Sequence, residues 1–190
     1  MKKYNYYIDK SYYTSYSRLL FGEFSEFLSE AEKNHLIHIF NVLKYNDLVL
    51  YCEPGWFRYN KVVKSLKKHK IPFAEYRIGS FFKKGLIIEC RYVDVIEYVL
   101  FELWPWYRLL FKVKVDQTPE SLDELKLCSD CIDGRSIDIK LLDYNDIILL
   151  VFYHGSFIEI VSKKNIYDQI IKKLSADDEV ILESCSIEKF

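Results

Sequence analysis

The sequence predicts a mixed α/β (α+β) fold in which helices cover a mixed sheet. Short apolar runs bounded by turn residues indicate buried strands, and apolar residues at helical spacing indicate amphipathic helices. A strand, a helix and a strand succeed one another in the first half, whereas two strands separated by a short turn occur in the second half. We therefore expect a parallel βαβ-containing first half and an antiparallel hairpin-containing second half around one mixed sheet.

The first half supplies the expected βαβ unit. Apolar residues recur every three or four positions over residues 20–28 and 36–43, which predicts two opening helices. Residues 47–52 form an apolar run that reads as a buried strand, and residues 56–69 place their apolar side chains on one face of a helix. A further strand is expected over residues 71–78, which completes the strand, helix and strand order.

The middle of the chain is expected to alternate strands and helices. Residues 86–90 and 107–115 have strand character, and residues 93–103 have helical character. A short helix is expected from Pro119 to Lys126, because Thr118 can cap it and proline is favoured at the first helical position.

The last third is expected to contain the hairpin. Two apolar runs, residues 147–153 and 157–161, are separated by His154-Gly155-Ser156, a sequence typical of a tight turn. A helix is expected over residues 165–174 and a final strand over residues 180–184.

Length and composition favour one domain spanning residues 1–190. The chain is 50% hydrophobic and 29% charged, which is typical of globular proteins and excludes disorder of the whole chain. One seam between two lobes is expected at residues 116–119, where the sign of the local charge also changes.

A cytoplasmic protein that does not enter membranes is expected. The apolar stretch from Val95 to Phe111 contains Glu97, Glu102 and Arg108, and each charge is costly at the centre of a bilayer. Five cysteines are an odd number, which suits a reducing compartment better than a set of structural disulfides.

No cofactor or resident metal is expected. The chain has no glycine-rich loop of the kind that cradles phosphates and no Gly-x-Ser-x-Gly nucleophile motif. Cys128 and Cys131 have the spacing of half a zinc site, but no second pair accompanies them, and we expect them to be loop thiols.

One catalytic alternative remains, a metal-dependent nuclease or phosphodiesterase. Restriction-type nucleases bring an acidic residue and an Asp-x-Lys triplet together on adjacent strands, where the carboxylates hold Mg²⁺. Asp138-Ile139-Lys140 has that spacing, Asp130 or Asp133 could supply the upstream carboxylate, and Glu159 could add another.

Charge is unevenly distributed along the chain. Residues 1–115 hold 19 basic and 12 acidic residues, whereas residues 116–190 hold 8 basic and 16 acidic residues. A second alternative, nucleic-acid binding, follows from the basic face expected on the helix at residues 56–69, formed by Arg58, Lys61, Lys64 and Lys68. The two charged parts could also interleave in space, in which case their fields would cancel.

The leading hypothesis concerns the acidic part. Carboxylates bordered by tyrosine suit a basic protein partner, because charge steers the encounter and aromatic anchors supply affinity. This predicts a non-enzymatic, cytoplasmic protein-binding protein, such as an immunity or antitoxin-type inhibitor of a basic partner. The residues expected to bind the partner are Asp143, Tyr144, Asp146, Asp177 and Asp178.

Overall fold

A computed structural model gives the fold of the chain. It describes residues 2–13, 16–22, 34, 37, 48–78, 83–90, 95, 98, 109–113, 121–134, 137–144, 147–151, 158–162, 166–176, 178 and 180–186. The predicted seam at residues 116–119 lies outside this part of the chain. Within it, no helix is both long enough and apolar enough to cross a bilayer.

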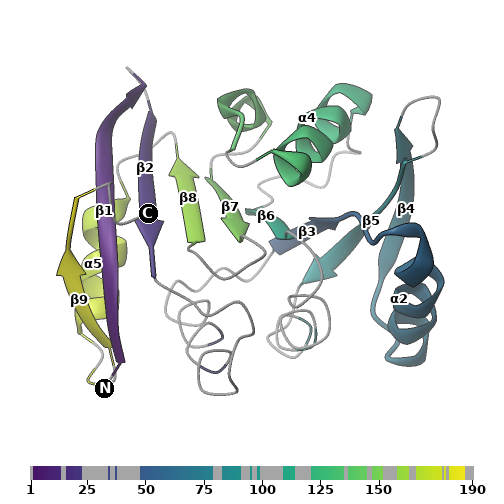
Figure 1. Cartoon of the computed structure of the whole chain (residues 1–190), viewed down its shortest axis with the longest axis horizontal. Helices are drawn as coiled ribbons and strands as arrows, with labels where there is room; N and C mark the ends of the chain where they lie inside the picture. The colour runs from purple at the N-terminus through teal and green to yellow at the C-terminus, as the bar shows by residue number, and fades with distance from the viewer. Residues whose placement is uncertain are drawn as a thin grey trace.

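The described strands form one continuous sheet, which confirms the mixed α+β fold class (Figure 1). All neighbouring strands in it are antiparallel except β1 and β9. In order of pairing, the strands are β4 (Phe73–Ile78), β5 (Lys83–Cys90), β3 (Leu48–Cys52), β6 (Leu109–Val113), β7 (Ile147–Val151), β8 (Ile158–Ser162), β2 (Tyr16–Phe21), β1 (Lys2–Tyr13) and β9 (Val180–Ser184).

The strand, helix and strand expected in the first half are β3, α2 (Trp56–Lys68) and β4. β3 and β4 run in the same direction, but β5 lies between them and pairs antiparallel with both. The expected direct parallel pairing is therefore corrected. Only residues 79–82 separate β4 from β5, and so short a connection favours an antiparallel neighbour over a crossover.

The opening of the chain is also corrected. Leu20, which we expected in a helix, lies in β2, and β1 and β2 pair with each other before the chain crosses to β3. Most residues of the two expected helices lie outside the described part of the chain. The side chains of β1 alternate between the two faces of the sheet, as expected for a strand. Tyr4, Tyr6 and Ile8, at every second position, all contribute to one hydrophobic core.

In the second half, the antiparallel hairpin is confirmed. β7 and β8 pair from Ile147 to Val151, although the expected turn at residues 154–156 lies outside the described part. A helix, α5 (Tyr167–Ser175), then leads to β9 as expected. The helix expected at Pro119 is instead α4 (Leu122–Asp133), which Ser121 caps and which continues past Lys126.

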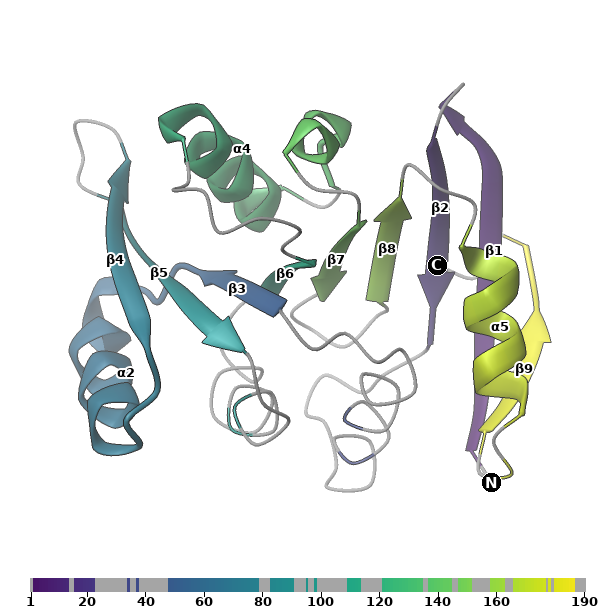
Figure 2. The same cartoon turned by 180° about the vertical axis from the view of Figure 1, so that it is seen from behind.

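The sheet separates two hydrophobic cores. On one face, α2 and α5 contribute Leu66, Tyr167 and Leu174 to a core with alternate residues of β3, β5 and β6. On the other face, α4 and a 3-10 helix, η2 (Ile139–Asp143), cover the remaining residues of the central strands. Figure 2 shows α5 against β1 at one end of the sheet and α2 beside β4 at the other.

Candidate functional site

α4 is held on the sheet by a buried ion pair. The Lys112 ammonium on β6 donates to the Glu124 carboxylate on α4, and both side chains are almost fully buried. The same ammonium lies 4.4 Å from the centroid of the Tyr51 ring, within the range of a cation–π interaction. Ser121 caps the start of α4, because its hydroxyl accepts a hydrogen bond from the Glu124 N–H at 3.0 Å. The position of α4 is therefore fixed by specific polar contacts as well as by apolar packing.

The cysteine pair that we expected in a loop lies on the buried side of α4. Cys128 and Cys131 belong to the core beneath the helix. Burial raises the pKa of the Cys131 thiol to about 12, with a smaller opposing effect from the hydrogen bond that the Asp138 N–H donates to its sulfur. A buried thiol with a raised pKa is a poor nucleophile. Among the described residues, no group of three or more His, Cys, Asp and Glu side chains is placed to hold a metal ion.

The Asp-x-Lys triplet lies at the start of η2, with Asp138 as the capping residue, and is not on a strand. The Asp138 carboxylate accepts a hydrogen bond from the Lys140 N–H at 2.9 Å and so caps the helix. Leu141 and Leu142 are the buried residues of η2. The Lys140 side chain is exposed to solvent. The triplet therefore has a local structural role at the start of this helix.

Glu159 is a buried carboxylate on β8 and lies beneath the start of η2. Its Oε1 atom is 3.7 Å from Nη1 of Arg18 on β2, and Arg18 Nη2 is 3.4 Å from Oδ2 of Asp9 on β1. Burial raises the pKa of Glu159 to about 7, although Arg18 and a hydrogen bond from the Ile137 N–H oppose this change. This hydrogen bond ties the residue just before Asp138 to the sheet. Asp138 therefore follows directly after a residue bonded to Glu159, but its carboxylate caps η2 and the Lys140 side chain is exposed, so the nuclease alternative stays a prediction.

The outer side of α4 and η2 is acidic and includes two exposed apolar side chains. Tyr144, which follows η2, is 45% exposed, and Leu122 at the start of α4 is 58% exposed. Oδ1 of Asp123 is 3.8 Å from Nζ of Lys126. This ion pair is exposed to solvent and neutralises little of the negative charge of the surface. All the residues that form this surface are exposed. We define the α4–η2 acidic surface as Leu122, Asp123, Asp130, Asp133, Asp143 and Tyr144.

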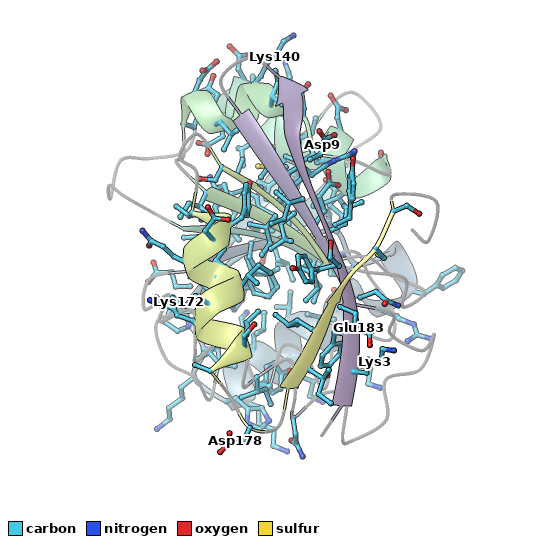
Figure 3. The ribbon with its side chains drawn as sticks, turned by 90° about the vertical axis from the view of Figure 1, so that its left-hand side faces the viewer. Lys3, Asp9, Lys140, Lys172, Asp178 and Glu183 are labelled. Carbon is cyan, nitrogen blue, oxygen red and sulfur yellow. The ribbon has the colours of Figure 1, made fainter. Side chains whose placement is uncertain are left out.

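The structure divides the residues that we expected to bind a partner. Asp143 and Tyr144 lie together in the α4–η2 acidic surface, but Asp178 lies between α5 and β9. Figure 3 shows Asp178 at the opposite end of the molecule from Lys140, which shares η2 with Asp143. Asp146 and Asp177 lie outside the described residues. Carboxylates that are close in the sequence therefore do not all contribute to one face.

The basic residues singled out from the sequence are all on α2. Lys61, Lys64 and Lys68 are exposed, and Arg58 is partly exposed. The helix packs through Tyr59, Val62 and Leu66, as its apolar spacing predicts. These cations lie at the β4 end of the sheet, on the face opposite α4, so the basic and acidic surfaces are separated in space (Figure 1).

Lys112 and Glu124 were missed by the analysis of the sequence. Two signals could have found them. A lysine inside the apolar run of β6 implies a partner if both faces of the sheet are covered, and Ser121 with Glu124 three residues later is the pattern that begins a helix.

Comparisons with known protein families, curated proteins and solved structures give no match for this chain.

Proposed function

We propose that the protein binds a basic protein partner through the α4–η2 acidic surface. The observation that carries this proposal is the exposure of Tyr144 and Leu122 on a layer whose exposed charges include Asp130, Asp133 and Asp143. Binding energy at protein interfaces is concentrated in a few anchors, with aromatic residues prominent among them. Surrounding carboxylates select a partner of opposite charge and accelerate the encounter.

Rigid attachment of this surface supports the same role. The Lys112–Glu124 ion pair fixes α4, and the hydrogen bond from Ile137 to Glu159 fixes the start of η2. A surface that is already ordered loses little conformational entropy on binding. We propose an inhibitor of the immunity or antitoxin type, which acts by occupying a basic surface of its partner and needs no chemistry of its own.

The proposed location is the cytoplasm. None of the five cysteines forms a disulfide bond, and Cys52, Cys90, Cys128 and Cys131 are buried. Such thiols are typical of proteins that fold in a reducing compartment.

A matched pair of charge reversals tests the proposal. The wild type, Asp143→Lys and Asp178→Lys are each used to capture partners from the source cells, and the captured protein is then purified for titration calorimetry. We expect an equimolar complex whose affinity is unchanged by Asp178→Lys, because that residue is remote from the surface. We expect Asp143→Lys to slow association, most strongly at low salt, and Tyr144→Ala to weaken binding by about thirtyfold. Equal affinity of the wild type, Asp143→Lys and Tyr144→Ala for every captured protein would refute the proposal.

A further inference from the structure

α2 presents a stripe of one aromatic and three basic side chains to solvent. Phe57, Lys61, Lys64 and Lys68 follow one another at intervals of four, three and four residues, which places them on one side of a helix. Phe57 is 77% exposed, and the three lysines are also exposed. No acidic residue occurs in α2, so within the helix the stripe has no neutralising carboxylate.

The neighbouring strands add two cations and one carboxylate, Glu75, which lies beside Tyr59 on the same side of the sheet. Arg77 on β4 lies opposite Lys84 on β5, and both are exposed. The Lys84 ammonium is 5.3 Å from the centroid of the Tyr59 ring, which places it on the α2 side of the sheet. Residues 48–90 contain nine basic and three acidic residues. We define the α2 basic surface as Arg58, Lys61, Lys64, Lys67, Lys68, Lys70, Arg77 and Lys84.

Lys70 provides a second, independent observation. Its φ of 56° lies in the left-handed region, and it is the only residue other than glycine with a positive φ in the described part of the chain. The N–H of Ile71 bonds to the carbonyl of Leu66, and the N–H of Lys70 bonds to that of Lys67, a helix-ending motif that usually has glycine at this position. With lysine at this position, the folding equilibrium constant of the protein is lower than it would be with glycine by roughly tenfold. It adds an exposed cation beside the end of α2.

We propose that the α2 basic surface binds single-stranded nucleic acid. Lysines at the spacing of one helix face contact successive phosphates, and an exposed aromatic ring at one end of the stripe stacks on a base. This combination of a basic track with an aromatic platform is the general mode by which proteins hold single strands. The activity is separate from the proposed protein binding, because the two surfaces lie on opposite faces of the sheet.

The aromatic residue distinguishes a single strand from other anions. An anionic membrane would be bound by a band of apolar side chains along the helix, whereas α2 exposes one large apolar side chain, Phe57, among its described residues. A duplex or an acidic protein could use the lysines, but neither offers unstacked bases to the ring. Contributions from Phe57 and from the lysines should therefore both be measurable.

The test uses fluorescence anisotropy of a labelled oligothymidine of about 20 nucleotides, a length that covers one site of this kind. We expect binding that weakens steeply between about 50 and 200 mM salt.

Lys61→Gln/Lys64→Gln should weaken binding at least about tenfold and flatten the salt dependence, since each lost phosphate contact lowers its slope by about 0.7. Phe57→Ala should weaken binding about tenfold without flattening it. Lys172→Gln/Lys173→Gln, which removes the same charge from exposed positions of α5, is the control and should have little effect.

Lys70→Gly separates folding from binding. Glycine relieves the left-handed strain, so the variant should unfold at a higher urea concentration than the wild type. The same variant loses one cation and should bind the oligonucleotide a few-fold more weakly. A variant that is more stable but binds less tightly cannot be explained by damage to the fold.

Several results would overturn the inference. The first is that the wild type does not bind the oligonucleotide at low salt. The second is that the α2 and α5 lysine variants lose the same affinity for it. The third is that Phe57→Ala binds it as tightly as the wild type does. Tighter binding to a DNA duplex, to polyglutamate or to vesicles containing phosphatidylserine, at matched charge concentration, would assign the surface to that other class of anion.

Discussion

Lys112→Met is expected to lower the free energy of unfolding by about 3–5 kcal/mol, the largest effect of a single substitution that we predict. The substitution removes the ammonium and leaves the Glu124 carboxylate buried under α4 without its positive partner. A buried charge that loses its counter-charge costs far more than the pair contributed, because neither water nor another cation replaces the contact. The cation–π contact with Tyr51 is lost as well. Urea denaturation followed by circular dichroism measures this change.

The double variant Lys112→Met/Glu124→Leu provides the control. This variant has no buried charge at either position, so it should recover most of the stability that Lys112→Met loses. If Lys112→Met alone unfolds at the same urea concentration as the wild type, the buried ion pair does not hold α4 on the sheet.

Glu159→Gln is expected to remove a pH dependence of about 2–3 kcal/mol from the stability of the wild type. The pKa of Glu159 rises from 4.5 to about 7 on folding because the side chain is buried. The folded protein therefore holds this proton more tightly than the unfolded chain does. That contribution to stability is fully present below pH 4.5, falls as the pH rises, and is lost above about pH 7.

The measurement compares the unfolding free energies of the wild type and Glu159→Gln at pH 5 and pH 8. Groups other than Glu159 titrate in both proteins, so their contributions largely cancel in the difference. Of the titratable groups near Glu159, Arg18 and Asp9 are on neighbouring strands, and Asp138 and the neutral Cys131 thiol are on the η2 and α4 side. The stability of the wild type relative to the variant should fall by about 2–3 kcal/mol from pH 5 to pH 8. A difference that does not change with pH would show that Glu159 ionises normally in the folded protein.

Local patterns in the sequence predicted elements better than they predicted the arrangement of the sheet. The apolar spacing of α2, the hairpin of β7 and β8, and β9 correspond closely to the structure. β1 was missed because its tyrosines, such as Tyr4 and Tyr7, are neither clearly apolar nor clearly polar, so an alternation of faces is hard to recognise. Leu20 and Phe24 have helical spacing, but pairing of Leu20 with neighbours on both sides places it in a strand.

Long-range pairing could not be derived from these patterns. The insertion of β5 between β3 and β4 satisfies the same local preferences as a direct parallel pair would. The same limit applies to the acidic residues. Asp143 ends η2, just before the central strand β7, whereas Asp178 lies between α5 and the edge strand β9. Distance along the chain therefore does not report their separation in space.

Buried charges were the least predictable features of the site. The lysine in β6 and the glutamate in β8 each interrupt an apolar run, which would suit a sheet with one face in water. α4 and η2 cover that face, and the two charges instead meet Glu124 and Arg18. Only the tertiary arrangement shows that these residues fix the α4–η2 acidic surface in place.

Hydrogen–deuterium exchange of the purified equimolar complex is the most direct measurement of whether this surface is the one a basic partner occupies. Our account predicts slower exchange on binding in peptides covering residues 121–144, and no change in a peptide containing Asp178. Protection confined to other segments, with residues 121–144 exchanging as fast in the complex as in the free protein, would contradict it.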